Sequence, residues 1–207
     1  MHEEEATRTT MKSSSHDLDR FKEAHTRVRE SARVIETLDL AALFEVSKLV
    51  SRTLANGGTI FAAGNGGSAA QAQHLVGELV GRFSAERPGL RAIGLGTDPV
   101  TTSAIGNDYG HHEIFTRQLL ALARTGDVLV AFSTSGASPN LVEASLRARS
   151  AGIHVASFVG DPVSDLANIS ECFFAVPGQT TAVVQEAHLV GLHSLCQVVE
   201  WELGWGT

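Results

Sequence analysis

The sequence has only two cysteines, Cys172 and Cys196, and both lie in apolar runs. Buried thiols of this kind are typical of a reducing compartment. The N-terminal residues lack the apolar segment of a secretory signal. No uninterrupted run of roughly 18 apolar residues is present, so we expect no membrane helix and no membrane partner. These absences together predict a cytoplasmic protein.

Basic residues are also scarce, since 16 Lys and Arg stand against 23 Asp and Glu, with a net charge of −7. Nucleic-acid-binding domains usually carry a basic footprint, so we expect no nucleic-acid partner, and an acidic surface mostly reports solubility. The remaining composition is ordinary for a globular protein, with 43% hydrophobic and 19% charged residues. A chain of this length fits one domain with a sizeable core.

Two helices are predicted before the first strand. Residues 1–15 are acidic and then rich in Ser and Thr without periodicity, and we predict a disordered tail there. Apolar residues recur at three- and four-residue steps over 15–36, and a second helix follows Asp39. Its broad apolar face favours packing against another subunit, with packing on the chain's own sheet alone as the alternative. Residues 16–207 are predicted to form one domain.

Short apolar strands alternate with helices along the rest of the chain. Strands are expected at residues 59–63, 90–95, 127–132, 153–159 and 170–176, and a long helix from about 181 to 203. This alternation predicts an α/β fold, in which a five-stranded parallel sheet lies between two helical layers. The three-layer sandwich is flavodoxin-like or Rossmann-like, and ligands are expected outside the carboxyl ends of its strands.

The turn after the first strand, residues 64–67 with the sequence GNGG, predicts an anion site. Glycines allow the backbone to approach a ligand closely, and Ser68 then opens an alanine-rich helix. The free N–H groups of a first helical turn favour an anion, for which phosphate is the natural candidate. A glycine turn without any phosphate is the alternative.

A second unit repeats this pattern with hydroxyl groups in place of glycines. The strand at 127–132 runs into residues 133–138, STSGAS, and a helix starts near Pro139. Hydroxyl and backbone N–H groups at a helix start form a cup for phosphate oxygens. A capping turn would need only one Ser or Thr, so phosphate binding is favoured over capping.

Polar side chains on two helices are candidates for metal or proton chemistry. His74 and Glu78, at i and i+4, lie about 6 Å apart on one helix face and can share an ion or a proton, with a surface pair as the alternative. Gln185 and His193 break the apolar run of the last helix, about 12 Å apart along its axis. They reach one ion only by leaning toward each other or from different chains, and the alternative for each is a hydrogen-bonded core residue. His188 is predicted to be a hydrogen-bonded core residue.

These motifs resemble the sugar isomerase (SIS) superfamily, and within it the sedoheptulose 7-phosphate isomerases, also called phosphoheptose isomerases. The resemblance covers residues 16–203, where the family's order and approximate spacing are matched by AAGNGGSAAQAQHL, ELVGRF, ERPG, AIGNDYG, GDVLVAFSTSGASPN and QEAH. One departure is that Ala182, Val183 and Val184 precede Gln185, where the family often carries polar or charged residues.

The resemblance implies a homotetramer with active sites between subunits and a small-molecule sugar phosphate as substrate. It implies one Zn²⁺ per site, held by the residues His74, Glu78, Gln185 and His193. Substrate contacts are implied for Asn65, Gly66, Gly67, Ser68, Glu78, Asn107, Asp108, Ser133, Thr134, Ser135, Ser138 and Gln185. Glu78 and His193 match the family's proton-transfer pair and are the expected catalytic residues.

The implied reaction converts sedoheptulose 7-phosphate to a D-glycero-D-heptose 7-phosphate, with manno configuration expected, through an enediol. Two alternatives stay open. One is a non-catalytic SIS binding module of the type associated with the bacterial replication initiator, and the other is an isomerase of another sugar phosphate. Such binding modules tend to lack the pair corresponding to Glu78 and His193, and both are present here. The sequence therefore favours the enzyme.

Overall fold

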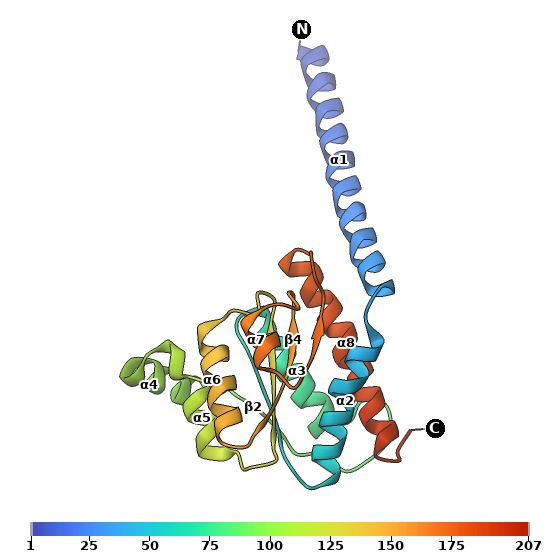
Figure 1. Ribbon diagram of the computed structural model, residues 1–207. Coiled ribbons are helices and arrows are strands. Elements are labelled where there is room, and N and C mark those ends of the chain that lie inside the picture. Colours follow the sequence, from blue (N-terminus) through green and yellow to red (C-terminus); the bar gives the residue numbers. More distant parts are fainter. Residues whose placement is uncertain (1, 207) are drawn as a thin grey trace. The chain divides into compact units, whose positions relative to one another are not determined.

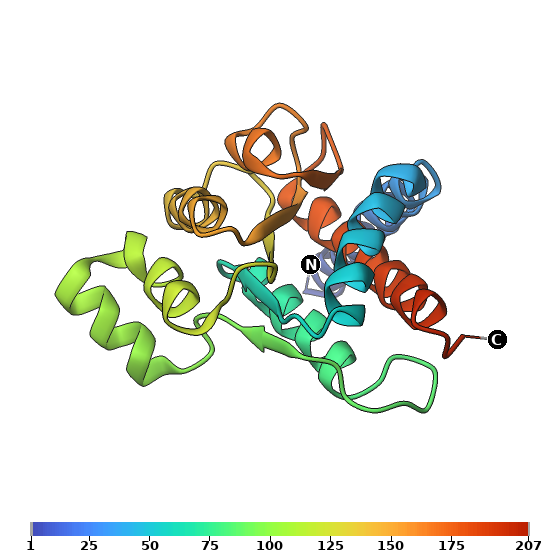
Figure 2. The ribbon, with the colours of Figure 1, turned by 60° about the horizontal axis from the view of Figure 1, so that its bottom comes forward.

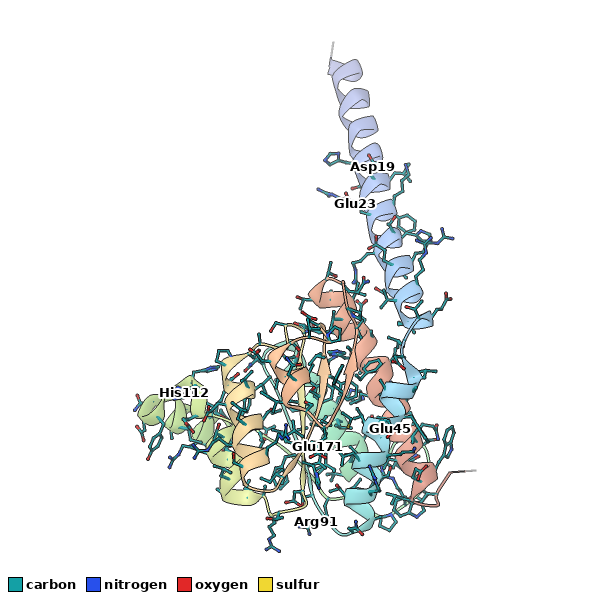
Figure 3. The ribbon with its side chains drawn as sticks, viewed as in Figure 1. Asp19, Glu23, Glu45, Arg91, His112 and Glu171 are labelled. Carbon is teal, nitrogen blue, oxygen red and sulfur yellow. The ribbon has the colours of Figure 1, made fainter. Side chains whose placement is uncertain are left out.

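The computed structural model describes residues 2–206, with side chains described from residue 16 onward. The chain divides into two compact units, Met1–Thr37 and Leu38–Thr207. The first unit is helix α1, His2–Glu36 (Figure 1). Acidic side chains such as Asp19 and Glu23 lie along this helix (Figure 3). Its apolar residues Leu18, Phe21 and Val28 are all more than half exposed.

Helix α1 begins well before the point that the sequence predicted. Residues 2–15 continue the helix predicted for 15–36, although a disordered tail was expected there. Half of residues 2–15 are Glu, Ala, Arg, Lys or Met, which have high intrinsic helix propensity, and the other half are mostly Ser and Thr. That residues 1–15 are mobile, and that 16–36 share one domain with the rest, stay predictions.

In the second unit, the described residues form a five-stranded parallel sheet with the strand order β2-β1-β3-β4-β5. The strands are β1 Ile60–Gly64, β2 Ala92–Gly94, β3 Val128–Ser133, β4 His154–Val159 and β5 Cys172–Ala175. In the central pair, Gly64 lies opposite Phe132 in parallel register. The turns that follow β1 and β3 are therefore neighbours at the carboxyl edge of the sheet.

Helices cover both faces of the sheet (Figures 1 and 2). The first face carries α2, α3 and α8, with α8 packed against both of the others, and the opposite face carries α5, α6 and α7. This arrangement confirms the predicted three-layer α/β fold. The bounds of these elements, with the intervening α4 and η1, are α2 Leu40–Ala55, α3 Gly67–Val80, α4 Pro99–Tyr109, η1 His111–Glu113, α5 Thr116–Leu122, α6 Pro139–Ser150, α7 Asp165–Ile169 and α8 Thr181–Glu202.

Under α8, the core contains a cluster of three phenylalanine rings. The Phe158 ring centroid lies 4.6 Å from that of Phe132 and 5.4 Å from that of Phe174. The imidazole of His188 contacts all three rings, and its Nε2 lies 3.1 Å from the carbonyl oxygen of Val159. This confirms His188 as a hydrogen-bonded core residue. Burial lowers the pKa of His188 to about 4, so its ring is neutral at pH 7.

Helix α2 has one covered side and one uncovered side. Asp39 caps it as predicted, because its carboxylate accepts hydrogen bonds from the N–H groups of Ala41 and Ala42. Val46 and Val50 are fully buried, whereas Leu40 is 64% and Phe44 39% exposed. The chain's own core thus covers only part of the broad apolar face.

Both cysteines are free thiols, Cys196 buried and Cys172 partly buried. Burial raises the pKa of Cys172 to about 11 and that of Cys196 to about 12, so both stay protonated at neutral pH. Among the described residues, no helix combines the length and apolar character that a bilayer crossing requires.

Candidate active site

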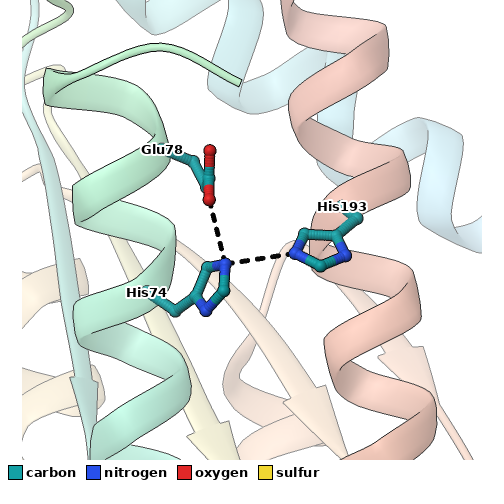
Figure 4. A group of neighbouring side chains, drawn as sticks. All are labelled: His74, Glu78 and His193. Carbon is teal, nitrogen blue, oxygen red and sulfur yellow. Dashed lines mark hydrogen bonds and ion pairs between the residues drawn. The ribbon is translucent and has the colours of Figure 1, made fainter. Parts of the chain in front are cut away.

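Helices α3 and α8 lie side by side and bring three polar side chains together (Figure 4). His74 Nε2 lies 3.0 Å from Glu78 Oε1 and 3.1 Å from His193 Nε2. One donor atom from each of the three residues lies within 4.8 Å of the other two. The two residues of the early helix thus meet a histidine of the last helix, and the side chains point toward one another (Figure 4).

The donor atoms of this cluster fit a divalent metal ion. Two imidazole nitrogens and one carboxylate oxygen are ligands that suit Zn²⁺. The site can be reached from outside, because the side chain of His74 is 39% exposed and that of Glu78 24%. The Phe83 ring lies 5.6 Å from the His193 ring and forms an apolar wall.

Gln185 contacts a different part of α3. A Cβ atom built on Gly67 would lie 2.5 Å from Gln185 Nε2, so the end of the Gln185 side chain packs directly against this glycine. Gln71 Nε2 donates a hydrogen bond of 2.5 Å to the backbone oxygen of Gln185. Gln185 therefore packs on the first turn of α3, whereas His193 meets α3 at His74, about two turns later. The role of Gln185 as a metal ligand stays a prediction.

The glycine turn joins β1 to α3 as predicted. No described side chain caps the first turn of α3, and its Ser68 and Ala69 N–H groups donate to the backbone oxygens of Asn65 and Gly66. Gly66 and Gly67 are exposed and Asn65 is half-buried, but Ser68 is only 4% exposed. Backbone groups, more than the Ser68 hydroxyl, are what this turn offers to an anion.

The serine turn after β3 holds a cluster of hydroxyl groups. Ser133 Oγ lies 3.2 Å from Ser138 Oγ and 3.4 Å from Ser135 Oγ, and it accepts a hydrogen bond from the N–H of Gly136. Gly136 has a φ of +64°, which glycine adopts without strain. Ser138 is the residue before α6, yet within the described chain its hydroxyl makes no capping bond. The hydroxyl groups therefore gather at one point of the turn, and phosphate binding there stays a prediction.

A pair of amides that the sequence did not reveal joins the two turns. Asn65 Nδ2 donates to Asn140 Oδ1 and Asn140 Nδ2 donates to Asn65 Oδ1, both at 2.9 Å. Asn140 is 2% exposed, so these bonds are shielded from water. In the sequence, only the position of Asn140 directly after Pro139, at the end of the serine turn, pointed to this role. The two turns are thereby held as one surface.

The structure does not bring Asn107 and Asp108 to this site within one chain. Both are exposed on α4 and share a hydrogen bond of 2.8 Å. They line a hollow formed by residues of α4 alone. All residues of α4 are described, and none of them is buried. In Figure 2, α4 and α8 lie at opposite sides of the unit.

The three apolar residues before Gln185, where the family often carries polar or charged residues, are mostly core residues. Val183 and Val184 are each 2% exposed, and Val184 packs near Gly160 at the end of β4. Ala182 is exposed. Only one of the three departing positions therefore offers its side chain to solvent or to a ligand.

Comparison with known proteins agrees with this geometry. Residues 21–160 match the SIS domain family. The phosphoheptose isomerase of Burkholderia pseudomallei is 44% identical over 161 residues, which cover 78% of this chain and 82% of that protein. The chain belongs to the phosphoheptose isomerase family.

Two further members of the family extend the match. The phosphoheptose isomerase of Geotalea daltonii is 46% identical over 180 residues, covering 87% of this chain and 92% of that protein. The solved structure of the phosphoheptose isomerase from Neisseria gonorrhoeae has a TM-score of 0.81 and 35% identity, covering 87% of this chain and 98% of that one. The resemblance inferred from the motifs is thus confirmed.

Proposed function

We propose that this protein is an aldose–ketose isomerase that converts sedoheptulose 7-phosphate to a D-glycero-D-heptose 7-phosphate. The observation that carries the proposal is the convergence of Glu78, His74 and His193 within 4.8 Å. Two linked turns at the nearby sheet edge supply donors for a phosphate. The relatives described as phosphoheptose isomerases support the sugar. A phosphorylated substrate and two free thiols also fit the predicted cytoplasmic location.

The chemistry needs a base and an acid on adjacent atoms of the sugar. Glu78 removes the proton from C1 of the ketose, and the electron pair moves to the C2 oxygen, which His193 protonates to give the enediol. His193 then removes the proton of the C1 hydroxyl, a carbonyl forms at C1, and Glu78 returns its proton to C2. One hydrogen is thereby moved from C1 to C2 and one from the C1 oxygen to the C2 oxygen, so atoms and electrons balance.

We propose that the site holds one Zn²⁺ with His74, Glu78 and His193 as ligands, and Gln185 as the fourth. When bound, the ion would supply Lewis-acid polarisation of the substrate carbonyl. Both imidazoles must present an unprotonated Nε2 to bind it, which leaves the ring protons on Nδ1. The 3.1 Å between the two Nε2 atoms fits this orientation, because both already point into the same space.

Removal of divalent metal is expected to abolish most of the isomerase activity, and added Zn²⁺ is expected to restore it. The protein would be dialysed against a chelator, its metal content measured by mass spectrometry and its kcat determined before and after addition of each divalent ion. A circular dichroism spectrum controls for unfolding. Full activity in protein shown to be metal-free would contradict the proposed metal site.

The assembly is proposed to be a homotetramer with active sites between subunits. An apolar cavity of about 660 Å³ lies beside His193 and is lined by exposed residues of α2 and α8, among them Leu40, Phe44 and Trp201. Contiguous apolar surface of this kind favours a protein partner. A second copy that covers it would also bring new side chains to the cluster. Light scattering after size exclusion measures the mass, and a monomer at micromolar concentration would contradict the proposal.

The function is tested by incubation with sedoheptulose 7-phosphate and detection of a new aldose phosphate by NMR. Pentose and hexose ketose phosphates serve as the comparison series. The heptose is expected to give the highest kcat/KM. Absence of any aldose product would overturn the proposed reaction, and faster turnover of a shorter sugar would overturn the proposed substrate.

The serine turn gives a prediction that separates phosphate binding from helix capping. Ser138→Ala is expected to raise the KM of the sugar phosphate about tenfold, because one hydrogen bond to a charged group is lost, with little change in Tm. Asp39→Ala is the matched control, since Asp39 caps α2, and its loss is expected to lower stability by about 1 kcal/mol without changing KM. A lower Tm with unchanged KM in Ser138→Ala would contradict phosphate binding.

A further inference from the structure

Near its end, α8 carries a carboxylate that is almost completely buried. Glu200 is 1% exposed and accepts hydrogen bonds from the backbone N–H groups of Phe83, Ser84 and Ala85, at 2.9–3.2 Å for the shortest bond of each. Its Oε1 also accepts from Arg87 Nε at 3.0 Å. Burying a charge is costly unless it is paired and hydrogen-bonded, and here the carboxylate is satisfied by the loop that follows α3.

Arg87 holds the end of α3 from the other side. Its Nη1 donates to the carbonyl oxygens of Leu79 and Pro88, and its Nη2 donates to that of Glu78 at 2.7 Å. The last carbonyls of a helix have no partner within the helix, so the guanidinium supplies one. The Trp205 ring lies 5.8 Å from the guanidinium carbon and covers it.

These contacts involve residues of the cluster formed by His74, Glu78 and His193. The carbonyl bonded by Arg87 Nη2 belongs to Glu78 itself. The N–H of Phe83 is bonded by Glu200, while the ring of Phe83 packs on His193. Glu200 and His193 lie seven residues apart on α8, so both project from one side of that helix.

We propose that Arg87 and Glu200 are positioning residues, which hold the Glu78 carboxylate and the Phe83 ring against His193. This inference rests on the proposed isomerase function. A role in stability alone is a weaker account, because a buried ion pair is often no more stabilising than apolar residues of the same volume. Gly81, the residue after α3, has a φ of −78° and forms no left-handed cap, so Arg87 takes over this function.

The test compares Glu200→Gln and Arg87→Lys with the wild-type protein. The Gln amide would turn N–H donors toward the backbone N–H groups of the loop, and Lys cannot reach three carbonyls and the carboxylate together. Each variant is expected to lose about 10- to 100-fold in kcat and a similar factor in Zn²⁺ affinity, measured by competition with a chromophoric chelator. The KM is expected to stay within about twofold, because the phosphate turns lie at the opposite end of α3.

The controls are Glu86→Gln, whose carboxylate lies in the same loop with a side chain 91% exposed, and Arg147→Lys on α6, which is 56% exposed. Both are expected to match the wild type. Rates would be measured well below the Tm of each variant, so that a loss of fold does not count as a loss of rate. Wild-type kcat and Zn²⁺ affinity in folded Glu200→Gln would overturn the positioning role.

A third variant guards against failure of the first two to fold. Trp205→Leu keeps both charges and removes only the ring that covers Arg87, so a several-fold lower kcat with an unchanged KM is expected. Wild-type kcat in Trp205→Leu, when the other two variants do not fold, would also overturn the inference. A wild-type protein without isomerase activity would instead overturn the proposed function and this inference together.

Discussion

Glu78→Gln is expected to lower kcat about 10³-fold, within the range that a positioned general base contributes. The amide keeps the length and shape of the side chain and still has an oxygen that can face His74, 3.0 Å away in the native protein. It cannot accept the C1 proton. Because Glu78 is also a proposed Zn²⁺ ligand, the Zn²⁺ content of the variant is measured as well, and loss of activity at unchanged Zn²⁺ content would report the missing base. Steady-state kinetics with sedoheptulose 7-phosphate provide the measurement.

Substrate binding is expected to survive this change, because the phosphate turns are formed by other residues. Calorimetric titration of Glu78→Gln with the ketose, which it does not turn over, is expected to give a Kd within a few fold of the wild-type KM. Glu86→Gln, in the exposed loop after α3, is the control for removal of one negative charge. A Glu78→Gln protein with most of the wild-type kcat would show that another group moves the proton.

Acid is expected to destabilise the fold through His188. Burial lowers its pKa from 6.5 to about 4, and within the described residues its Nδ1 atom has no partner that could stabilise a proton there. Between these two pH values the unfolded chain binds a proton that the folded chain does not. Stability is therefore unaffected above pH 6.5 and falls as the pH falls, by about 3 kcal/mol when pH 4 is reached.

Comparison with His188→Gln isolates this contribution. The Gln amide can still donate to the carbonyl oxygen of Val159 but does not titrate, so its free energy of unfolding should fall less between pH 7 and pH 4. Urea unfolding at several pH values provides the measurement. His154→Gln is the control, since His154 is partly exposed and pairs with Glu171 at 2.8 Å. Equal pH dependence in His188→Gln and wild type would contradict the assignment.

Features that depend on neighbours in the chain could be predicted from the sequence. A strand, a glycine turn and a helix follow one another between residues 59 and 80, and each has a local signature in residue type and period. The placement of His74 and Glu78 on one helix face follows from their spacing alone. Alternation of such units was sufficient to predict the parallel sheet and the edge where its turns meet.

Long-range pairings were decided only by the tertiary structure. Asn65 meets Asn140 because β1 and β3 are neighbours, and Glu200 meets Arg87 because α8 lies along α3. Each pair is far apart in sequence, and residue type alone does not select a partner among many equivalent polar groups.

The position of His193 depends partly on the sequence and partly on the tertiary structure. The sequence marked it as a polar residue that needs partners, and helix packing then set its distance from His74. The same packing left Gln185 at the glycine turn and left Asn107 and Asp108 on an uncovered helix. Backbone period fixes which face a side chain occupies, whereas the register between packed helices determines what that face meets.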